Sequence, residues 1–227
     1  MAVDEAVLKS ASDIGQSTLR FYGWQPATLS LGYFQQLQDR NLHQASRDCM
    51  IVRRASGGGA ILHDIELTYA FATPVSIRRS GAEAMYFSFH ETLVAALSEF
   101  GVEARLHRSD EGLRDTPFLC FERRADGDVV CQGYKVAGSA QRRWKNALLQ
   151  HGSILIRKSL YAPELPGLSD LANFSGDAQT IVERWLPKLS TELKTDFHRG
   201  TLTDKEFETV RELRSEKFSR DSWIGRR

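Results

Sequence analysis

Three consecutive glycines, Gly57 to Gly59, constrain the fold more than any other feature, because so permissive a backbone ends any regular element. Met50–Val52 leads into them and Ala60–His63 follows, and both flanking runs are typical of β-strands. Glycines between strands let the backbone come close to a ligand, with amide groups left to hold its oxygen atoms. The Gly-Lys-Ser/Thr ending of a phosphate loop is missing, so a plain turn is the alternative.

The other strands are predicted from short aromatic and aliphatic runs bounded by glycine or proline. Pro74 is expected to end one strand, and Gly138-Ser139 is expected to turn the chain between two others. Hairpin-like strands with flanking helices indicate an α+β fold rather than alternating βαβ units. The strands are predicted over residues 19–31 (two strands joined by a turn), 60–63 and 67–71 (strands of one sheet), 129–137 and 148–156.

Helices are predicted mainly where apolar residues recur every three or four positions. Gly101 follows the clearest of these runs, where a C-cap is expected. Thr203 and Glu206 fit a capping box at the start of a helix near the C-terminus. The helices are predicted over residues 2–11, 39–49, 82–100 and, as two or three helices, 178–213.

The composition is that of a neutral globular protein. A hydrophobic content of 41% and a charged content of 26% exclude a disordered or fibrous chain, and 227 residues suit one large domain or two small ones. The net charge of +1 provides no general attraction for nucleic acid or an anionic membrane. Because a membrane-spanning run and a signal peptide are both missing, we expect a cytoplasmic protein.

The three cysteines, Cys49, Cys120 and Cys131, are too few and too widely spaced for a disulfide framework or a zinc site, so no metal is predicted. Cys49 and Cys131 have apolar neighbours and fit inert, buried thiols. Cys120 lies in a polar stretch, residues 107–128, that is predicted to be a long loop. Cys120 is therefore a candidate nucleophile, with a small core residue as the alternative.

Lys135 stands between apolar residues in a strand-like run. Because a buried ammonium group is unfavourable unless it is paired, a lysine here indicates a chemical role; an edge-strand lysine pointing to water is the alternative. Arg53 and Arg54 can pair with an anionic ligand; the alternative is one solvated charge and one structural salt bridge. His63 and His151 can line a site or make ordinary hydrogen bonds.

Together these segments resemble the lipoate ligase and octanoyltransferase superfamily, whose members have the fold of the biotin protein ligase catalytic core. The resemblance rests on the stretches Arg53–Asp64, Gly133–Gln141 and Leu149–Ser153. It spans nearly the whole chain, from the early helix motif at residues 1–6 to Trp223. Several ordered motifs at suitable separations are far more specific than any one of them.

The resemblance implies an α+β catalytic domain with a mixed, mostly antiparallel sheet flanked by helices. We expect the domain core over residues 1–165 and a helical extension over residues 166–227 packed on the same domain. The partners that it implies are octanoyl-acyl carrier protein as donor and a lipoyl domain or the glycine-cleavage H protein as acceptor. A monomer is expected.

Two chemistries occur in that superfamily. Ligases activate lipoate with ATP as an acyl-adenylate, whereas transferases carry an octanoyl group on a cysteine thioester. The stretch His63–Tyr69 looks like the transferase form, because ligases commonly have a Gly-Asn pair after the His-Asp. Cys120 lies 15 positions before Lys135, as in octanoyltransferases of the LipM type. The resemblance thus implies a transferase without a cofactor. One alternative is a ligase that uses ATP and magnesium with Lys135 and Arg54. The other is a non-catalytic acyl- or lipoyl-binding module.

In the transferase interpretation Cys120 is the nucleophile and Lys135 polarises the thioester carbonyl and favours the thiolate. Backbone amides near Gly59-Ala60 and Gly138-Ser139 are expected to hold the oxyanion. An apolar slot for the eight-carbon chain is expected from Ile61, Leu62, Leu67 and Val136. The substrate-binding residues predicted in this way are Arg54, Ser56, Gly57, Gly58, Gly59, Ala60, Ile61, Leu62, His63, Val136, Ala137, Gly138, Ser139, His151 and Gly152.

Overall fold

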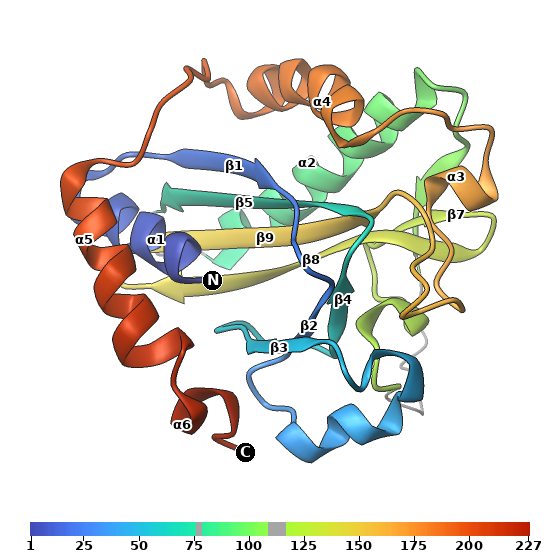
Figure 1. The fold of residues 1–227 in the computed structure, drawn as a ribbon. Coiled ribbons are helices and arrows are strands. Elements are labelled where there is room, and N and C mark those ends of the chain that lie inside the picture. The colour runs from blue at the N-terminus through green and yellow to red at the C-terminus, as the bar shows by residue number, and fades with distance from the viewer. Residues whose placement is uncertain (76–78, 109–116) are drawn as a thin grey trace.

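The computed structural model describes residues 1–75, 79–108 and 117–227, and a six-stranded sheet runs through its centre (Figure 1). The strand order is β1-β5-β9-β8-β7-β6, and every neighbouring pair is antiparallel. Its members are β1 (Thr18–Tyr22), β5 (Glu66–Pro74), β6 (Ala104–Leu106), β7 (Val129–Cys131), β8 (Tyr134–Trp144) and β9 (Ala147–Leu155).

A second, three-stranded sheet lies below the first in Figure 1. β2 (Thr28–Leu31) is its central strand, parallel to β3 (Met50–Arg53) and antiparallel to β4 (Ile61–His63). The glycine triplet therefore joins two strands, as predicted. β4 and β5, predicted to be strands of one sheet, enter different sheets, and so do β1 and β2, the two strands predicted over residues 19–31. The predicted α+β fold with a mixed, mostly antiparallel arrangement of strands is confirmed.

Helices cover both faces of the large sheet (Figure 1). Along β5, Tyr69 and Phe71 pack into the core formed with α2 and α4, whereas Ala70 and Ala72 pack against α1. This alternation follows from the period of two in a strand. The helices and helical turns are α1 (Ala2–Ile14), η1 (Leu37–Leu42), η2 (Gln44–Ser46), α2 (Arg79–Ser98), η3 (Cys120–Glu122), α3 (Leu168–Leu171), α4 (Ala178–Leu193), α5 (Asp204–Leu213), η4 (Arg214–Phe218) and α6 (Asp221–Ile224).

The predicted strand at 129–137 is in fact two strands. Gln132 and Gly133 have φ angles of 48° and 84°, which is the backbone of a tight two-residue hairpin turn between β7 and β8. Gly138-Ser139, predicted to turn the chain, continues β8 and pairs with β9 instead. The turn prediction was wrong because a glycine inside a strand can also mark a close approach of other atoms.

The predicted helix at 39–49 is replaced by two 3-10 turns, η1 and η2. The guanidinium of Arg40 donates hydrogen bonds to the carbonyl oxygens of Arg47 and Cys49, which ties the end of this segment back onto itself. This segment also lacks the apolar stripe that would hold a longer helix against the core.

The other helix predictions agree with the structure. α1, α2, α4 and α5 lie at the predicted positions, with ends that differ by a few residues. Gly101 follows α2 with φ 72°, and Thr203 and Glu206 form the expected capping box. In the predicted loop 107–128, residues 109–116 lie outside the described residues, and η3 is the helical turn in the rest.

The C-terminal helices pack on the same body as the sheets. α4 packs on α2, α5 packs on α1, and the indole of Trp223 in α6 donates a hydrogen bond to the Arg53 carbonyl at the end of β3. The division of the chain at residue 165 stays a prediction. Within the described residues, no helix is both long and apolar enough to cross a membrane.

Candidate active site

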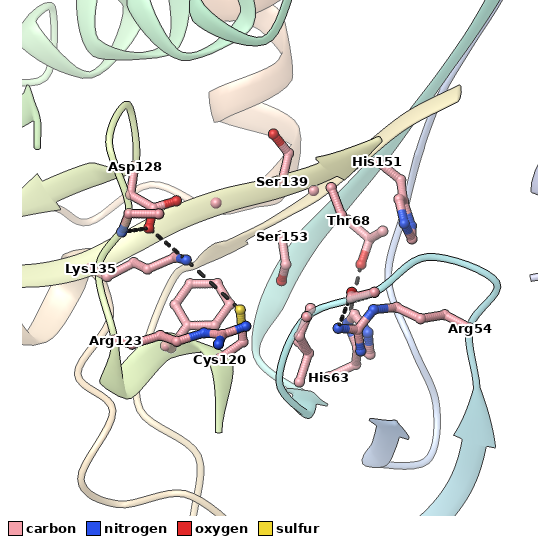
Figure 2. A pocket seen from close by; sticks show the side chains of 18 of the residues that line it. Arg54, His63, Thr68, Cys120, Arg123, Asp128, Lys135, Ser139, His151 and Ser153 are labelled. Atoms are coloured by element: carbon pink, nitrogen blue, oxygen red, sulfur yellow. Dashed lines mark hydrogen bonds and ion pairs between the residues drawn. The ribbon is translucent and has the colours of Figure 1, made fainter. Parts of the chain in front are cut away.

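A cavity of about 520 Å³ lies between the large sheet and the small one. Its floor is one row of paired positions that crosses four strands: Gly138 of β8, Ser153 of β9, Thr68 of β5 and Tyr22 of β1. The glycine triplet, β4 and the segment around Cys120 enclose it from the other side. Figure 2 shows Cys120 and Lys135 on one side of this cavity and the histidines His63 and His151 on the other.

A β-bulge places Lys135 over the cavity floor. Val130 pairs with Lys135 but Val129 pairs with Ala137, so β8 advances two residues while β7 advances one. The extra residue is Val136, and both Val136 and Ala137 pack into the core beneath the sheet. The bulge therefore puts Lys135 and Gly138 on the same face of β8.

Lys135 is buried, with 7% of its surface exposed, and it is paired as a buried lysine must be. Its Nζ lies 2.8 Å from Oδ2 of Asp128. The hydroxyl of Tyr86 donates to Oδ1 of the same carboxylate at 3.1 Å, and the amide of Ala125 donates to Oδ2 at 2.7 Å. A Cβ on Gly138 would lie 2.4 Å from Cε of Lys135, so the glycine leaves the space that the ion pair occupies.

Ala60, directly after the glycine triplet, holds the Cys120 segment in place. The amide of Ala60 donates to the carbonyl of Phe118 at 2.8 Å, and the amide of Cys120 donates to the carbonyl of Ala60 at 2.7 Å. A Cβ on Gly59 would lie 3.1 Å from the Cys120 nitrogen, so a larger residue would crowd this contact. The Ala60 amide already has an acceptor and is not free to hold an oxyanion. An oxyanion role for the other amides near Gly59-Ala60 and Gly138-Ser139 stays a prediction.

Cys120 lies among positive charges. Its Sγ accepts a hydrogen bond from Nζ of Lys135 at 3.8 Å. Burial alone would raise the pKa of the Cys120 thiol, but the charges of Lys135, Arg54 and Arg123 outweigh burial and the nearby Asp128, so the pKa is lowered. A lower pKa increases the thiolate fraction at neutral pH.

Arg53 and Arg54 hold backbone rather than an open anion site. Arg54 donates from Nη1 to the carbonyl of Ser30 and from Nη2 to those of Gly57 and Gly59, at 2.6 to 2.8 Å. Arg53 donates to four other carbonyl oxygens in the same way. Burial lowers the pKa of Arg54 to about 10. Arg54 thus shapes the glycine loop and adds positive charge near Cys120.

The histidines at and beside the cavity differ in their partners. His151 shares a hydrogen bond of 2.6 Å with Ser56 through Nε2, and burial lowers its pKa to about 4. His90 of α2 contacts the Gly127 carbonyl through Nδ1 and the Ser139 hydroxyl through Nε2, and burial lowers its pKa to about 4 as well. Both imidazoles are therefore neutral at pH 7.

The comparison with protein families decides where the chain belongs. The family described as "Lipoyl protein ligase A/B catalytic domain" matches residues 1–192. The chain belongs to this family. The predicted resemblance to lipoate ligases and octanoyltransferases is therefore confirmed.

Known proteins match over nearly their whole length. Octanoyltransferase LipM of Moorella thermoacetica is 33% identical over 258 residues, covering 100% of this chain and 93% of that protein. Octanoyltransferase LipM of Clostridioides difficile is 33% identical, covering 100% of this chain and 94% of that protein. The crystal structure of lipoate-protein ligase A bound with ATP has a TM-score of 0.78 at 25% identity, covering 98% of this chain and 91% of that one.

Most of the predicted site residues meet at this cavity. Several of the others are buried in the two cores, because strand alternation or the bulge turns them away from the cavity: Ala60, Leu62, Val136, Ala137 and the slot candidate Leu67. Ser56 shares a hydrogen bond with His151, and Gly59 contacts the Cys120 segment. The predicted residues that line the cavity are Arg54, Gly57, Gly58, Ile61, His63, Cys120, Lys135, Gly138, Ser139, His151 and Gly152.

Sequence reasoning missed Asp128, Tyr86, Thr68, Ser153 and Arg123, which also line the cavity. The position of Asp128 in the sequence could have indicated it, because Asp128 directly precedes β7, the hairpin partner of the strand that carries Lys135. Thr68 and Ser153 face the cavity through the pairing of β5 with β9, which the sequence does not reveal. Within the described residues, no group of three or more His, Cys, Asp or Glu side chains is placed to hold a metal ion.

Proposed function

We propose that the protein takes an octanoyl group from octanoyl-acyl carrier protein as a thioester on Cys120 and transfers it to a lysine of a lipoyl domain or the glycine-cleavage H protein. Full-length similarity to several octanoyltransferases supports the transfer of an octanoyl group. Membership of a lipoyl protein ligase family supports a lipoyl-type acceptor. No cofactor is needed, because the donor is already a thioester.

The contact between Cys120 and Lys135 carries this proposal. A nucleophilic thiol must be ionised, and the ammonium group 3.8 Å from Sγ favours the thiolate. Asp128 holds that ammonium group in place from the side away from the sulfur (Figure 2). A lysine bound only to solvent would not keep this geometry.

Thioester exchange moves the acyl group without a change of oxidation state. The sulfur of Cys120 attacks the carbonyl carbon of the donor thioester, a new carbon–sulfur bond forms, and the carrier's thiolate leaves. Lys135 stabilises the negative charge that develops on oxygen and on the leaving sulfur. The octanoyl chain then occupies the cavity, where each buried methylene contributes about 0.8 kcal/mol.

Intact mass spectrometry tests the first step directly. The protein is mixed with octanoyl-acyl carrier protein in the absence of ATP, and we expect a covalent octanoyl adduct. Cys120→Ala is expected to form no adduct, whereas Cys131→Ala, which removes a buried thiol outside the cavity, should behave like the unmodified protein. An adduct that persists in Cys120→Ala would overturn the proposal.

An ATP-dependent lipoate ligase is the second candidate, favoured by the structural similarity to lipoate-protein ligase A bound with ATP. Lipoate, ATP and magnesium are added with a lipoyl domain in place of the acyl donor. Modification of the domain under these conditions, with no octanoyl adduct in the first experiment, would favour the ligase. Binding of octanoate or lipoate without either product would favour a non-catalytic binding module.

A further inference from the structure

The side chain of Arg123 lines the cavity close to Cys120 and has no partner in the protein. Arg123 is half-buried, and within residues 1–75, 79–108 and 117–227 its guanidinium makes no hydrogen bond or ion pair. A guanidinium has five N–H donors and stays protonated in proteins. These donors are therefore available to a molecule that binds in the cavity.

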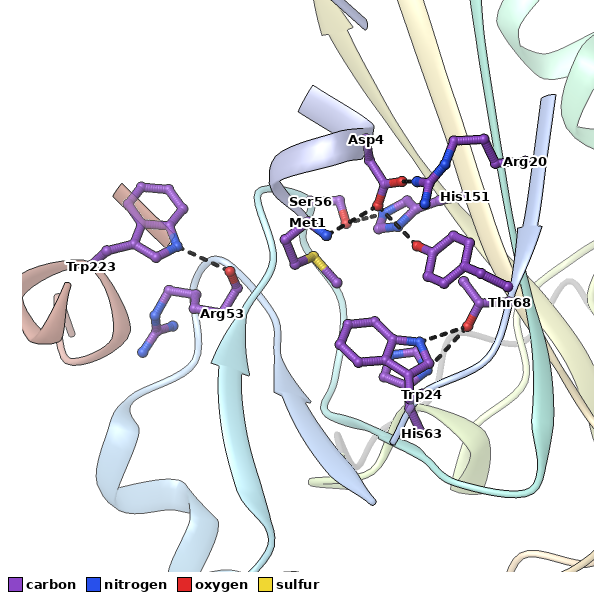
Figure 3. A network of polar contacts seen from close by, with 11 residues as sticks. Met1, Asp4, Arg20, Trp24, Arg53, Ser56, His63, Thr68, His151 and Trp223 are labelled. Atoms are coloured by element: carbon purple, nitrogen blue, oxygen red, sulfur yellow. Dashed lines mark hydrogen bonds and ion pairs between the residues drawn. The ribbon is translucent and has the colours of Figure 1, made fainter. Parts of the chain in front are cut away.

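Other arginines around the cavity have partners for their donors. Arg54 donates to three backbone carbonyl oxygens, and Arg20 of β1 donates to the buried carboxylate of Asp4 (Figure 3). Arg124 also lines the cavity, but it is exposed, so water can accept from it. Among the cavity-lining arginines that the structure describes, Arg123 combines partial burial with free donors.

Both ends of the Arg123 side chain lie close to Cys120. At one end, the Arg123 amide donates to the carbonyl of Cys120 at 3.4 Å, where η3 ends. At the other end, a Cβ on Gly58 would lie 3.7 Å from Nη2 of Arg123, and a Cβ on the next residue, Gly59, would lie 3.2 Å from Cα of Cys120. The side chain thus extends from the turn that carries Cys120 to the glycine loop that contacts it.

The charge of Arg123 is also effective at the sulfur. Against the effect of burial, three cationic side chains lower the pKa of the Cys120 thiol, and Arg123 is the third of them. Figure 2 shows its guanidinium on the same side of the cavity as Cys120 and Lys135. An acyl group on Sγ would therefore have its carbonyl oxygen near this guanidinium.

That oxygen needs hydrogen-bond donors during the reaction. When the sulfur attacks, the carbonyl oxygen becomes negative, and enzymes that transfer acyl groups stabilise it with preorganised donors, often two. Lys135 can supply one, but its ammonium group is shared between Asp128 and Sγ. The Ala60 amide is already engaged with a carbonyl. The free donors of Arg123 lie on this side of the cavity, where a second donor is needed.

We propose that the guanidinium of Arg123 donates hydrogen bonds to the oxygen of the octanoyl thioester and stabilises its negative charge in both half-reactions. The inference rests on the proposed function and adds a catalytic residue to it. In thioester formation, the bond from Cys120 to the carbonyl carbon forms and an electron pair moves to the oxygen. The pair returns as the bond to the carrier's sulfur breaks and the carrier leaves as a thiolate.

The transfer to the acceptor passes through the same charged oxygen. The acceptor lysine first loses one proton to solvent, and its neutral amine attacks the carbonyl carbon. The carbon–nitrogen bond forms, the bond to Cys120 breaks, and the second proton of the amine passes to solvent. Arg123 keeps its protons throughout, so it acts by charge and hydrogen bonding alone.

Two reactions of the same sulfur separate this role from an effect on the thiol. Iodoacetamide reacts at a saturated carbon and produces no oxyanion, so it reports the thiolate alone. We expect Arg123→Ala to slow alkylation of Cys120 at pH 7 by no more than about threefold, because solvent screens this partly exposed charge. Thioester formation with saturating octanoyl-acyl carrier protein, followed by intact mass, should slow about 100-fold.

The second half-reaction is measured by adding a lipoyl domain to the isolated acyl-protein. Because the same oxygen becomes negative, Arg123→Ala should slow this transfer by a similar factor. Arg199→Ala removes an exposed arginine outside the cavity and should leave all three rates unchanged. Alkylation of Arg123→Ala at nearly the normal rate would also show that the variant has folded.

A small guanidinium compound provides a further test. Methylguanidinium should restore part of the rate of thioester formation and of transfer in Arg123→Ala, because it can enter the space that the side chain leaves. It should not change the rate of alkylation, in which no oxyanion forms.

The outcomes distinguish the inference from the proposed function. If the unmodified protein forms no thioester, the proposed function fails. If it completes both steps, equal losses of alkylation and of thioester formation in Arg123→Ala would mean that Arg123 acts on the thiol alone. A loss confined to thioester formation would mean that Arg123 binds the carrier protein. Either result would overturn the role of Arg123 at the carbonyl oxygen.

Discussion

The two sides of the cavity differ in what determines the pKa of their buried side chains (Figure 2). On the charged side, formed by Cys120, Asp128, Lys135 and Arg123, neighbouring cations lower the pKa of the thiol although burial opposes them. On the histidine side, formed by His63, His151 and Thr68, burial lowers the pKa of His151 to about 4 and leaves it neutral. Neighbouring charges therefore outweigh burial on the charged side, whereas burial outweighs them on the histidine side.

The cysteines outside the cavity show the same rule. Burial raises the pKa of Cys131, and Glu103 raises it further. Burial also raises the pKa of Cys49, where Asp64 adds to the effect. Cys120 differs from both by its three cationic neighbours, Lys135, Arg54 and Arg123. A lowered thiol pKa is therefore a property of the charged side, whereas burial alone raises the pKa of a cysteine.

The largest difference between the cysteines is expected in activity. Cys120→Ser should reduce octanoyl transfer to a lipoyl domain by at least about 1,000-fold, because a hydroxyl at neutral pH is a far weaker nucleophile than a thiolate. Cys131→Ser should change the rate less than threefold, after correction for any loss of folded protein. The rates are measured by mass spectrometry of the lipoyl domain. Equal losses in the two variants would mean that the charged side is not the reactive centre.

Lys135→Met tests the largest attractive contribution on the charged side. Without its ammonium group the pKa of Cys120 should rise, and each unit of increase lowers the thiolate fraction about tenfold at pH values below it. Iodoacetamide labelling of Cys120 between pH 6 and 10, followed on the labelled peptide, measures this pKa. We expect the midpoint to lie below that of an ordinary thiol in the unmodified protein and to rise in the variant.

A profile that does not move in Lys135→Met would remove the lysine from the activation of the thiol. Lys205→Met is a suitable control, because Lys205 is exposed on α5 and does not line the cavity. It should leave the midpoint unchanged.

The elements of the fold were largely predictable, but their pairing was not. The run of residues 82–100 and the capping box at Thr203 follow local rules, and both are present. Gly138 misled the prediction because glycine is common both in turns and where a side chain crosses a strand closely. Only the structure shows that Lys135 lies over this glycine, since the bulge at Val136 changes the side of the strand that Lys135 faces.

Individual residues of the candidate site could be predicted from the sequence, but the contacts between them could not. Cys120 and Lys135 were identified through the family resemblance and through the rarity of a lysine in an apolar strand. Asp128 becomes visible as the partner of Lys135 only after the sheet pairs β7 with β8. The residues predicted to line the apolar slot for the octanoyl chain include Leu62 and Val136, which the structure buries in the two hydrophobic cores instead.

His90 provides a pH test of a neutral group that lies close to the charged side. Its pKa of about 4 in the folded protein is below the ordinary value of about 6.5, so between these values the unfolded chain binds a proton that the folded protein excludes. The free energy of unfolding should therefore be unaffected by His90 above pH 6.5 and fall by up to about 1.4 kcal/mol per pH unit toward pH 4.

Urea unfolding of the protein and of His90→Gln at several values between pH 7 and pH 4.5 measures this contribution. The variant is expected to be less stable at pH 7, because the contacts with Gly127 and Ser139 are weakened, but its stability should fall less steeply with acid. Parallel curves for the two proteins would show that His90 accepts a proton in the folded state as readily as in the unfolded chain.

The smallest expected effect on the charged side is that of Arg123. Its guanidinium is half-buried and contributes less than Lys135 or Arg54 to lowering the pKa of Cys120. Because solvent screens a partly exposed charge, Arg123→Ala should slow iodoacetamide labelling of Cys120 at pH 7 only about two- to threefold, and added salt should reduce the difference. Arg199→Ala removes an equal charge from an exposed position outside the cavity and should have no effect. A loss as large as that of Lys135→Met would mean that proximity to the sulfur matters less than the total positive charge around the cavity.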